Sequence, residues 1–384
     1  MSITKNVFTL KKAYELIVDG QWSQFDLLDE TDTTTGALWS WGNSAGTGRI
    51  GLNDTISRSS PTQIPGDWTT VSRRADWTLM SAHKSDGTLW IWGSGNNGNL
   101  GLGNTIHISS PTQIPGTNWI NSFHGGYGGS FAIKSDGTSW VWGQNSAYET
   151  SLGLNDLIIR SSPVQLPGSW TFFTASRGGS SFGFKTDGTL WVWGNNGSGN
   201  HGLGNTIPRS SPIQLPGTSW RAITSGYQRV SLGIKSDGTL WGWGANSQGE
   251  LAQGNTIYRS SPVQIPGNTW TCVDAQTNRS FGVKSDGTLW AWGNGASGVL
   301  GLNNLISRCS PTQIPGNSWC SVEVGRAQVF ALKTDNTLWA WGQNPNAFLG
   351  LNDSIYRSSP TQIPGTQWKV VASAYFNTLA KKSI

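Results

Sequence analysis

The chain has 384 residues, of which 12% are charged, and it contains 51 glycines and 23 tryptophans. This composition excludes a disordered chain and a helical bundle, because helix formers are scarce while aromatic, β-branched and turn residues are abundant. The net charge of +5 is small for this length and no run of Lys and Arg occurs, so the sequence does not favour nucleic acid as a partner. An all-β protein fits these properties.

Residues 1–32 precede a repeated region and read as an amphipathic extension. Thr9 can cap a helix that places Leu10 and Ile17 on one face and ends at Gly20. So short a helix is marginal alone and persists only if its apolar face is buried, either against the rest of the chain or on another subunit. We favour a role as an anchor to other virion or assembly subunits. The sequence shows neither a signal peptide nor a membrane span, so we expect a virion or cytoplasmic location.

A repeat occupies residues 33–384 and is best seen in the element Leu-Trp-x-Trp-Gly. Its copies are 49 to 51 residues apart and begin at Leu38, Leu89, Ser139 (Ser in place of Leu), Leu190, Leu240, Leu289 and Leu338. A fixed period of about 50 residues indicates a repeat architecture rather than two ordinary domains. The residues that recur in every copy are therefore predicted to be scaffold.

Each repeat contains four predicted strands in chain order. The Trp-rich strand is followed by a Gly- and Asn-rich connection, and then by "SPTQIP", whose two prolines suit an edge strand. A third strand starts at the Trp after each Pro-Gly, and a fourth ends in "KSDG", where Asp-Gly is a strong hairpin signal. Four short antiparallel strands per repeat of about 50 residues predict one propeller blade.

The two ends of the chain predict how the ring closes. The sequence ends within a repeat at "NTLAKKSI", and the first copy starts at Gly36, the equivalent of the turn glycine. Strands from residues 36–42 and 368–382 are therefore predicted to pair in one composite blade. Closure of this kind removes the exposed sheet edges of an open array.

The pattern "DGTLWxWGxNxxGxLG", repeated seven times with closure across the ends, resembles the RCC1 repeat (regulator of chromosome condensation). The resemblance covers nearly the whole chain and implies a seven-bladed β-propeller. Among RCC1-like proteins, the uniform copies look most like bacterial and bacteriophage-type members. Family members that act as guanine nucleotide exchange factors for a small GTPase, or that bind nucleosomes, carry a projecting insertion and a basic tail, which this chain lacks.

No arrangement of residues indicates an enzyme, a metal site or a cofactor. The four histidines, His83, His107, His124 and His201, share no metal-ligand spacing, and no catalytic or phosphate-loop motif occurs. One Asp per hairpin turn provides too few oxygens for calcium and is explained by turn geometry. Ala252 replaces the glycine after the Gly/Asn-rich stretch in one copy, so this glycine is not expected to serve a positive-φ catalytic loop. The three cysteines, Cys272, Cys309 and Cys320, are expected to be unpaired thiols.

Six repeats carry an Arg before Ser-Ser-Pro or Cys-Ser-Pro, and symmetry places these residues in a ring on one face. We call them the rim arginines, and they are Arg58, Arg160, Arg209, Arg259, Arg308 and Arg357, with Ile108 in the seventh repeat. The ring could hold phosphates or acidic sugars. We favour the alternative that each guanidinium bonds its own loop, because the residue recurs with the scaffold.

The copies differ most between the strand after Pro-Gly and the next hairpin, and these seven segments should lie on one face. Aromatic residues and Arg, which binding surfaces enrich, are frequent there. The candidate binding residues are Arg73, Arg74, Asp76, Trp77, His124, Tyr127, Arg177, Tyr227, Arg229, Arg279, Arg326 and Tyr375, with Phe376 beside them. Neutral drift in exposed loops would give the same variability.

Two functional hypotheses follow from the sequence. The first is a non-enzymatic binding or structural protein, a virion or surface component that recognises a protein partner, a receptor or a host-surface glycan through the variable segments. The second is an intracellular RCC1-type adaptor or guanine nucleotide exchange factor for a small GTPase.

Overall fold

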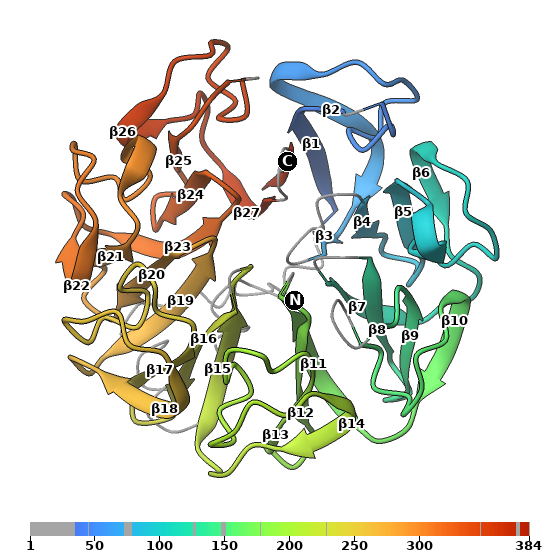
Figure 1. Ribbon diagram of the computed structural model, residues 1–384. Helices are drawn as coiled ribbons and strands as arrows, with labels where there is room; N and C mark the ends of the chain where they lie inside the picture. The colour runs from blue at the N-terminus through green and yellow to red at the C-terminus, as the bar shows by residue number, and fades with distance from the viewer. Residues whose placement is uncertain are drawn as a thin grey trace, which may run out of the picture.

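The computed structural model describes residues 35–44, 46–72, 79–125, 128–146, 151–176, 178–227, 229–345, 347–373 and 377–383. Within these residues the repeats form seven four-stranded antiparallel sheets, arranged as blades around a central axis (Figure 1). The predicted seven-bladed propeller with four strands per blade is thus confirmed. The predicted extension at residues 1–32 lies outside the described residues.

Blades A to G follow chain order, and the strands of each are given from the axis outward (Figure 1). Blade A consists of β27 (Trp368–Ser373), β28 (Asn377–Ser383), β1 (Gly36–Gly42) and β2 (Arg58–Trp68). Blade B consists of β3 (Thr70–Val71), β4 (Leu79–His83), β5 (Leu89–Gly93) and β6 (Ile108–Gln113). Blade C consists of β7 (Trp119–His124), β8 (Gly129–Lys134), β9 (Ser139–Gly143) and β10 (Arg160–Leu166).

Blade D consists of β11 (Trp170–Ala175), β12 (Ser180–Lys185), β13 (Leu190–Gly194) and β14 (Arg209–Gln214). Blade E consists of β15 (Trp220–Ser225), β16 (Val230–Lys235), β17 (Leu240–Gly244) and β18 (Arg259–Ile265). Blade F consists of β19 (Trp270–Gln276), β20 (Arg279–Lys284), β21 (Leu289–Gly293) and β22 (Arg308–Gln313). Blade G consists of β23 (Trp319–Val324), β24 (Gln328–Lys333), β25 (Leu338–Gly342) and β26 (Arg357–Gln362). The short 3-10 turns η2 (Asn96–Gly98) and η3 (Ala296–Gly298) follow β5 and β21.

The outermost strand of each blade contains the Ser-Pro sequence, as predicted from its prolines, so no ladder bond is lost at the missing N–H groups. Blade A is the composite blade. Its β1 pairs with β28 from Gly36 opposite Ser383 to Gly42 opposite Asn377, and with β2 on its other side. Residues from the two ends of the sequence therefore close the ring, as predicted.

The second Trp of each Leu-Trp-x-Trp-Gly element ties its blade to the preceding one. Trp92 is fully buried and its Nε1 donates to the backbone oxygen of Arg49, 3.1 Å away in blade A. Equivalent bonds of 2.7 to 3.0 Å are made by Trp41, Trp142, Trp193, Trp243, Trp292 and Trp341. Burial of an indole with its N–H satisfied stabilises each seam between blades, which confirms the prediction that the repeated residues are scaffold.

The backbone at Ala252 keeps the left-handed conformation of the glycines that occupy this position in the other repeats. The glycines at the equivalent position have positive φ, for example 76° at Gly202, and Ala252 itself has a φ of 56°. A Cβ on Gly202 would lie 2.9 Å from Nε1 of Trp243. The position therefore does favour glycine, and Ala252 tolerates a strained backbone.

We expect Ala252→Gly to raise the free energy of unfolding by about 1 kcal/mol, because an L-residue in the left-handed region costs roughly 1–2 kcal/mol and glycine does not pay it. Urea denaturation measures the change. The matched variant Gly202→Ala should shift stability in the opposite direction. Equal stability of Ala252→Gly and wild type would contradict this explanation.

Candidate partner-binding face

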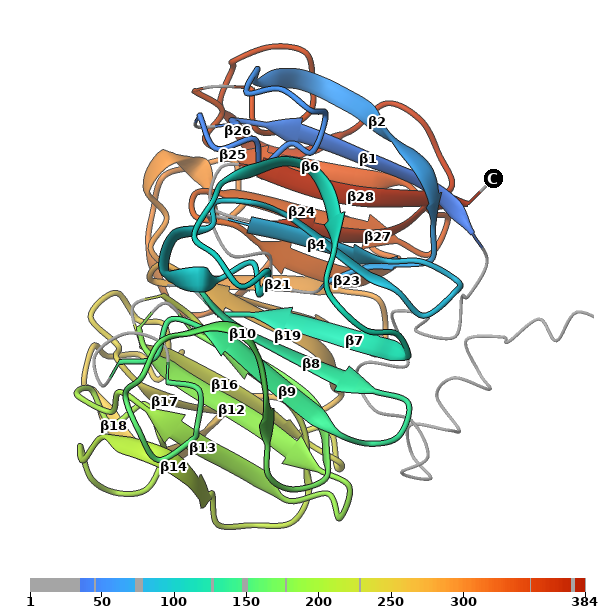
Figure 2. The same ribbon diagram turned by 90° about the vertical axis from the view of Figure 1, so that its right-hand side faces the viewer.

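The antiparallel strand order places the connections of the blades at two faces of the ring. The "KSDG"-type hairpins and the Pro-Gly turns lie at one, the hairpin face. The connections between first and second strands, and those between third and fourth strands, lie at the other, the loop face. The side view in Figure 2 shows the strands running from one face to the other.

The hairpin face repeats one set of contacts. Oδ1 of Asp86 accepts bonds from N and Oγ1 of Thr88 at 3.0 and 2.6 Å, and these bonds lower the pKa of the Asp86 carboxyl. Nζ of Lys84 lies 3.9 Å from the ring centre of Trp90. The turn bonds recur at Asp136, Asp187, Asp237, Asp286 and Asp335. The turn explanation of these aspartates is therefore confirmed.

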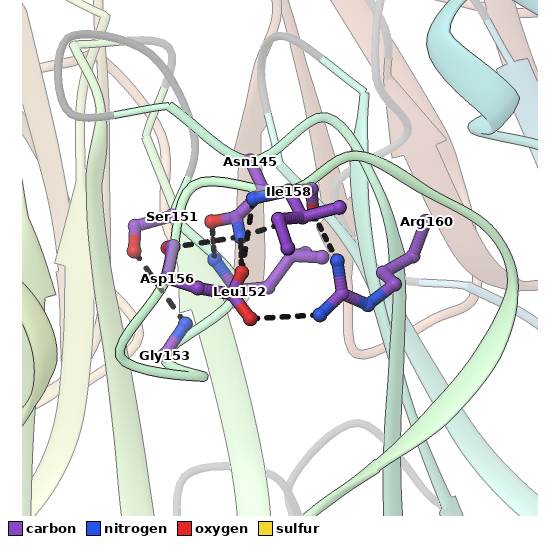
Figure 3. A network of polar contacts seen from close by, with 7 residues as sticks. All are labelled: Asn145, Ser151, Leu152, Gly153, Asp156, Ile158 and Arg160. Carbon is purple, nitrogen blue, oxygen red and sulfur yellow. Dashed lines mark hydrogen bonds and ion pairs between the residues drawn. The ribbon is translucent and has the colours of Figure 1, made fainter.

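Three rim arginines bond within their own loops, which confirms the within-loop interpretation for them. Arg160 Nη2 lies 2.7 Å from Asp156 Oδ2, and its Nη1 donates to the backbone oxygen of Ile158 at 2.8 Å (Figure 3). Arg58 pairs in the same way with Asp54 at 2.7 Å, and Arg357 with Asp353 at 2.6 Å. These pairs lie in blades A, C and G.

The other three rim arginines lack that partner. The position of the aspartate is occupied by Asn205, Asn255 and Asn304, which precede Arg209, Arg259 and Arg308 by four residues. Within the described part of the chain, the side chains of Arg259 and Arg308 make only long contacts of 3.5 Å, each to the carbonyl of the preceding residue. The Nε of Arg209 is buried and has no hydrogen-bond partner among the described residues. All three lie in adjacent blades, D, E and F.

The structure describes only some of the candidate binding residues of the variable segments. Outside the described residues are Arg73, Arg74, Asp76, Trp77, Tyr127, Arg177, Tyr375 and Phe376. The described ones are His124, Tyr227, Arg229, Arg279 and Arg326. Tyr227, Arg229 and Arg326 lie on the loop face of blades E and G, whereas Arg279 is buried at the loop-face end of β20 in blade F.

Arg229 adopts a left-handed backbone conformation that glycine adopts at the equivalent position in blades C and D. Its φ is 68°, and the equivalent residues Gly128 and Gly179 have φ of 93° and 91°. The backbone oxygen of each accepts a bond from the residue after the third strand, at 3.1 Å for Arg229. A strained arginine on a variable segment is a candidate for function, because selection for folding alone would favour glycine.

Arg279 and Arg326 bring two positive charges together between blades F and G. Arg279 is 7% exposed, and its Nη1 donates to the backbone oxygen of Arg326 at 2.6 Å. Burial, and then the charge of Arg326, lower the pKa of Arg279 to about 10. Asp274, a buried carboxylate on β19 of blade F, accepts bonds from Thr224 Oγ1 and from the backbone N of Val324, both at 2.8 Å. It thereby links blades E, F and G.

His124 is not a surface residue of the loop face, contrary to its inclusion among the candidates. It is 2% exposed, and its Nε2 lies 2.6 Å from Ser81 Oγ in blade B while its Nδ1 lies 2.9 Å from Ser130 Oγ. Burial lowers its pKa to about 3, so the ring is neutral. His124 therefore stabilises the seam between blades B and C.

One set of loop-face residues was missed from the sequence. Every blade exposes an isoleucine two residues before the rim position, with 53–63% of each side chain accessible, and these are Ile56, Ile106, Ile158, Ile207, Ile257, Ile306 and Ile355. Their recurrence made them look like scaffold. The signal was an apolar residue isolated among polar residues in the Gly- and Asn-rich connection.

Within the described residues, no group of three or more His, Cys, Asp or Glu could hold a metal ion. The same part of the chain contains no helix that is both long and apolar enough to cross a bilayer. All three cysteines are free thiols, as expected.

Three segments, residues 86–133, 237–275 and 286–332, match the family model described as the regulator of chromosome condensation (RCC1) repeat. The chain thus carries RCC1 repeats on a seven-bladed propeller. No curated protein sequence matches it.

Several solved structures have a similar fold. Human WBSCR16 is 17% identical, with a TM-score of 0.77 over 91% of this chain and 99% of that one. Prp20p from Saccharomyces cerevisiae is also 17% identical, with a TM-score of 0.81 over 94% of this chain and 95% of that one. The same yeast protein in complex with Kap60 matches at 17% identity and a TM-score of 0.81, over 100% of this chain and 94% of that one. Identity this low shows a shared fold and nothing further.

Proposed function

We propose that this protein is a non-enzymatic adaptor of the RCC1 type that binds a protein partner through its loop face. The observation that carries the proposal is the contrast between the two faces. The hairpin face repeats the same Lys, Asp, Thr and Trp contacts from blade to blade, whereas the loop face departs from the repeat at Arg229, Arg279 and Arg326. Arginine and aromatic side chains at irregular positions are what partner-binding surfaces enrich.

The similar structures favour an intracellular RCC1-type partner over a virion role. Prp20p is described by its binding to Gsp1p and histones, and as yeast RCC1 it was solved bound to Kap60. The similar structures named above are human and yeast proteins, so the expectation of a bacterial or phage-type virion component, or of a host glycan as ligand, draws no support from them. The interpretation of residues 1–32 as an assembly anchor stays a prediction.

Guanine nucleotide exchange on a small GTPase is the specific activity to test. Exchange requires a surface that binds the nucleotide-free form of the GTPase more tightly than the loaded form, and it requires no catalytic side chain. A propeller with a shaped binding face and no enzyme motif is compatible with that chemistry.

The test uses the full-length protein, purified Gsp1p and purified histones. We expect binding of at least one of them, and we expect Arg229→Gly to weaken it about fivefold or more, as truncation of an interface arginine does. The same variant should be as stable as wild type or more stable, because glycine relieves the left-handed backbone. The control Ser236→Ala, at an exposed position of the hairpin face, should leave binding unchanged.

Failure to bind either protein would contradict the RCC1-type assignment. Loss of binding in Ser236→Ala together with full binding by Arg229→Gly would place the partner on the opposite face. Release of a fluorescent guanine nucleotide from Gsp1p, with and without the protein, tests the exchange activity directly.

A further inference from the structure

We propose that the loop face of blades D, E and F binds an acidic peptide segment that also carries apolar side chains. The proposal rests on the adaptor function and adds the chemistry of the partner. It starts from the three rim arginines of these blades, Arg209, Arg259 and Arg308, which we call the basic sector together with Arg229.

The basic sector exists because blades D, E and F have an amide nitrogen (Asn Nδ2) where blades A, C and G have a carboxylate oxygen (Asp Oδ2). Oδ1 of Asp156 and Oδ1 of Asn255 play the same role, since each accepts a bond from the backbone N of the following isoleucine at 2.9 and 3.0 Å. The second atom differs. Asp156 Oδ2 pairs with Arg160, whereas Asn255 Nδ2 donates to the carbonyl of Gln253 at 3.0 Å and cannot pair with Arg259. The turn is thus kept while the charge of the arginine is left uncompensated.

Among the residues that the structure describes, no other carboxylate in the loops of these blades compensates for these charges. The loop-face connections of blades D, E and F contain one acidic residue, Glu250. It is fully buried, and burial raises its pKa, so its charge is disfavoured. Asp274 on β19 is buried and its oxygens accept bonds from neighbouring blades. An external anion is therefore the complementary charge for this sector, and partly buried arginines bind carboxylates with two parallel bonds.

The neighbouring side chains favour a peptide over a nucleic acid. Each arginine of the rim stands two residues after an exposed isoleucine, namely Ile207, Ile257 or Ile306, and the adjacent Tyr258 and Leu305 are 51% and 64% exposed. A phosphate backbone would leave these apolar side chains without contacts. A segment that carries both carboxylates and apolar side chains satisfies the arginines and covers the isoleucines.

The decisive variant is Asn205→Asp/Asn255→Asp/Asn304→Asp, which rebuilds in blades D, E and F the ion pair that blades A, C and G already contain. The probe is a fluorescein-labelled peptide rich in glutamate and leucine, and fluorescence anisotropy measures its binding to the full-length protein at low salt. We expect the variant to bind about tenfold more weakly than wild type, since three exposed charge interactions are lost. It should remain folded, because the native chain uses the same Asp-Arg pair elsewhere.

A matched control adds the same negative charge to the hairpin face. Ser85→Asp/Ser236→Asp/Ser285→Asp changes three exposed serines and should leave peptide binding within about twofold, because most of the attraction acts within a Debye length. The reciprocal variant Asp54→Asn/Asp156→Asn/Asp353→Asn, which releases three further rim arginines, should bind at least as tightly as wild type.

Equal weakening by both Asp variants would mean that net charge alone drives binding, and it would overturn the proposal. So would failure of the wild type to bind the peptide, or tighter binding of a single-stranded oligonucleotide than of the peptide. These outcomes are distinct from failure of the adaptor function: Gsp1p or histones could still bind through Arg229 while the peptide does not. A peptide that binds while both proteins fail to bind would contradict only the RCC1-type assignment.

Discussion

Lowering the pH from about 7 to about 5 is expected to reduce the free energy of unfolding by about 2 kcal/mol for each of three buried histidines. Burial lowers the pKa of His83 to about 4 and those of His124 and His201 to about 3, against an ordinary value of 6.5. The unfolded chain therefore binds more protons than the folded chain below pH 6.5, so stability falls as the pH drops through 6.5 toward 4. Urea denaturation at a series of pH values measures this slope.

The positions of these histidines show which parts of the fold should lose stability at low pH. His83 Nε2 lies 2.9 Å from Ser122 Oγ, and with His124 it forms a polar seam between blades B and C. His201→Gln should remove about one third of the pH dependence, because it deletes one of the three rings whose pKa is lowered by burial. The aspartates of the hairpin turns, whose pKa values are lowered, affect stability only below about pH 4. Equal stability at both pH values would show that the buried rings take up protons in the folded state as readily as in the unfolded chain.

Deleting residues 33–42 is expected to abolish cooperative folding. The deletion removes β1, so β28 and β2 each lose a paired neighbour in blade A. It also removes Trp41, which is fully buried between blades, with its ring 6.0 Å from that of Phe330 and its Nε1 bonded to the backbone oxygen of Phe348 at 3.0 Å. Differential scanning calorimetry should show a broad, low transition in place of one sharp peak.

A milder variant keeps this test informative if the deletion does not express. Trp41→Ala should lower the free energy of unfolding by about 3–5 kcal/mol, the usual cost of deleting a buried large aromatic side chain. Trp39→Ala, in the same strand but only partly buried, should cost less. A sharp and unshifted transition in the deletion variant would mean that blade A does not need β1.

The architecture follows from the sequence because it depends on residues that recur. The Trp pairs, Asp-Gly turns and Ser-Pro strands each have a local physical meaning, and their period places them in blades. The composite blade was equally predictable, since the first and last copies are halves of one repeat. Ala252 shows the limit: its alanine gave no sign that this position has a positive φ, beside the closely packed Trp of the following blade.

The proposed binding residues were harder to predict, because their exposure and charge depend on the side-chain contacts that each one makes in the folded protein. The variability of the segments predicts binding through the loop face, but it did not distinguish the buried His124 from the strained Arg229. The interpretation of the rim arginines as bonded within their loops holds for Arg58, Arg160 and Arg357, where an aspartate lies four residues earlier. The difference between Asp and Asn at that position was visible in the sequence. Its effect on the charge of the arginine could be recognised only in the structure, where both residues make the same turn bond but only Asp pairs with the arginine.

The proposed function requires the partner to bind the loop face, and site-specific photocrosslinking in cells that make the protein can test this requirement. A photoreactive amino acid is placed at Tyr227, Arg259 or Arg326 on the loop face, and at Ser85, Ser236 or Ser285 on the hairpin face. We expect discrete crosslinked partners from the loop-face positions and none from the hairpin-face positions. Crosslinks formed from the hairpin face alone would contradict the account.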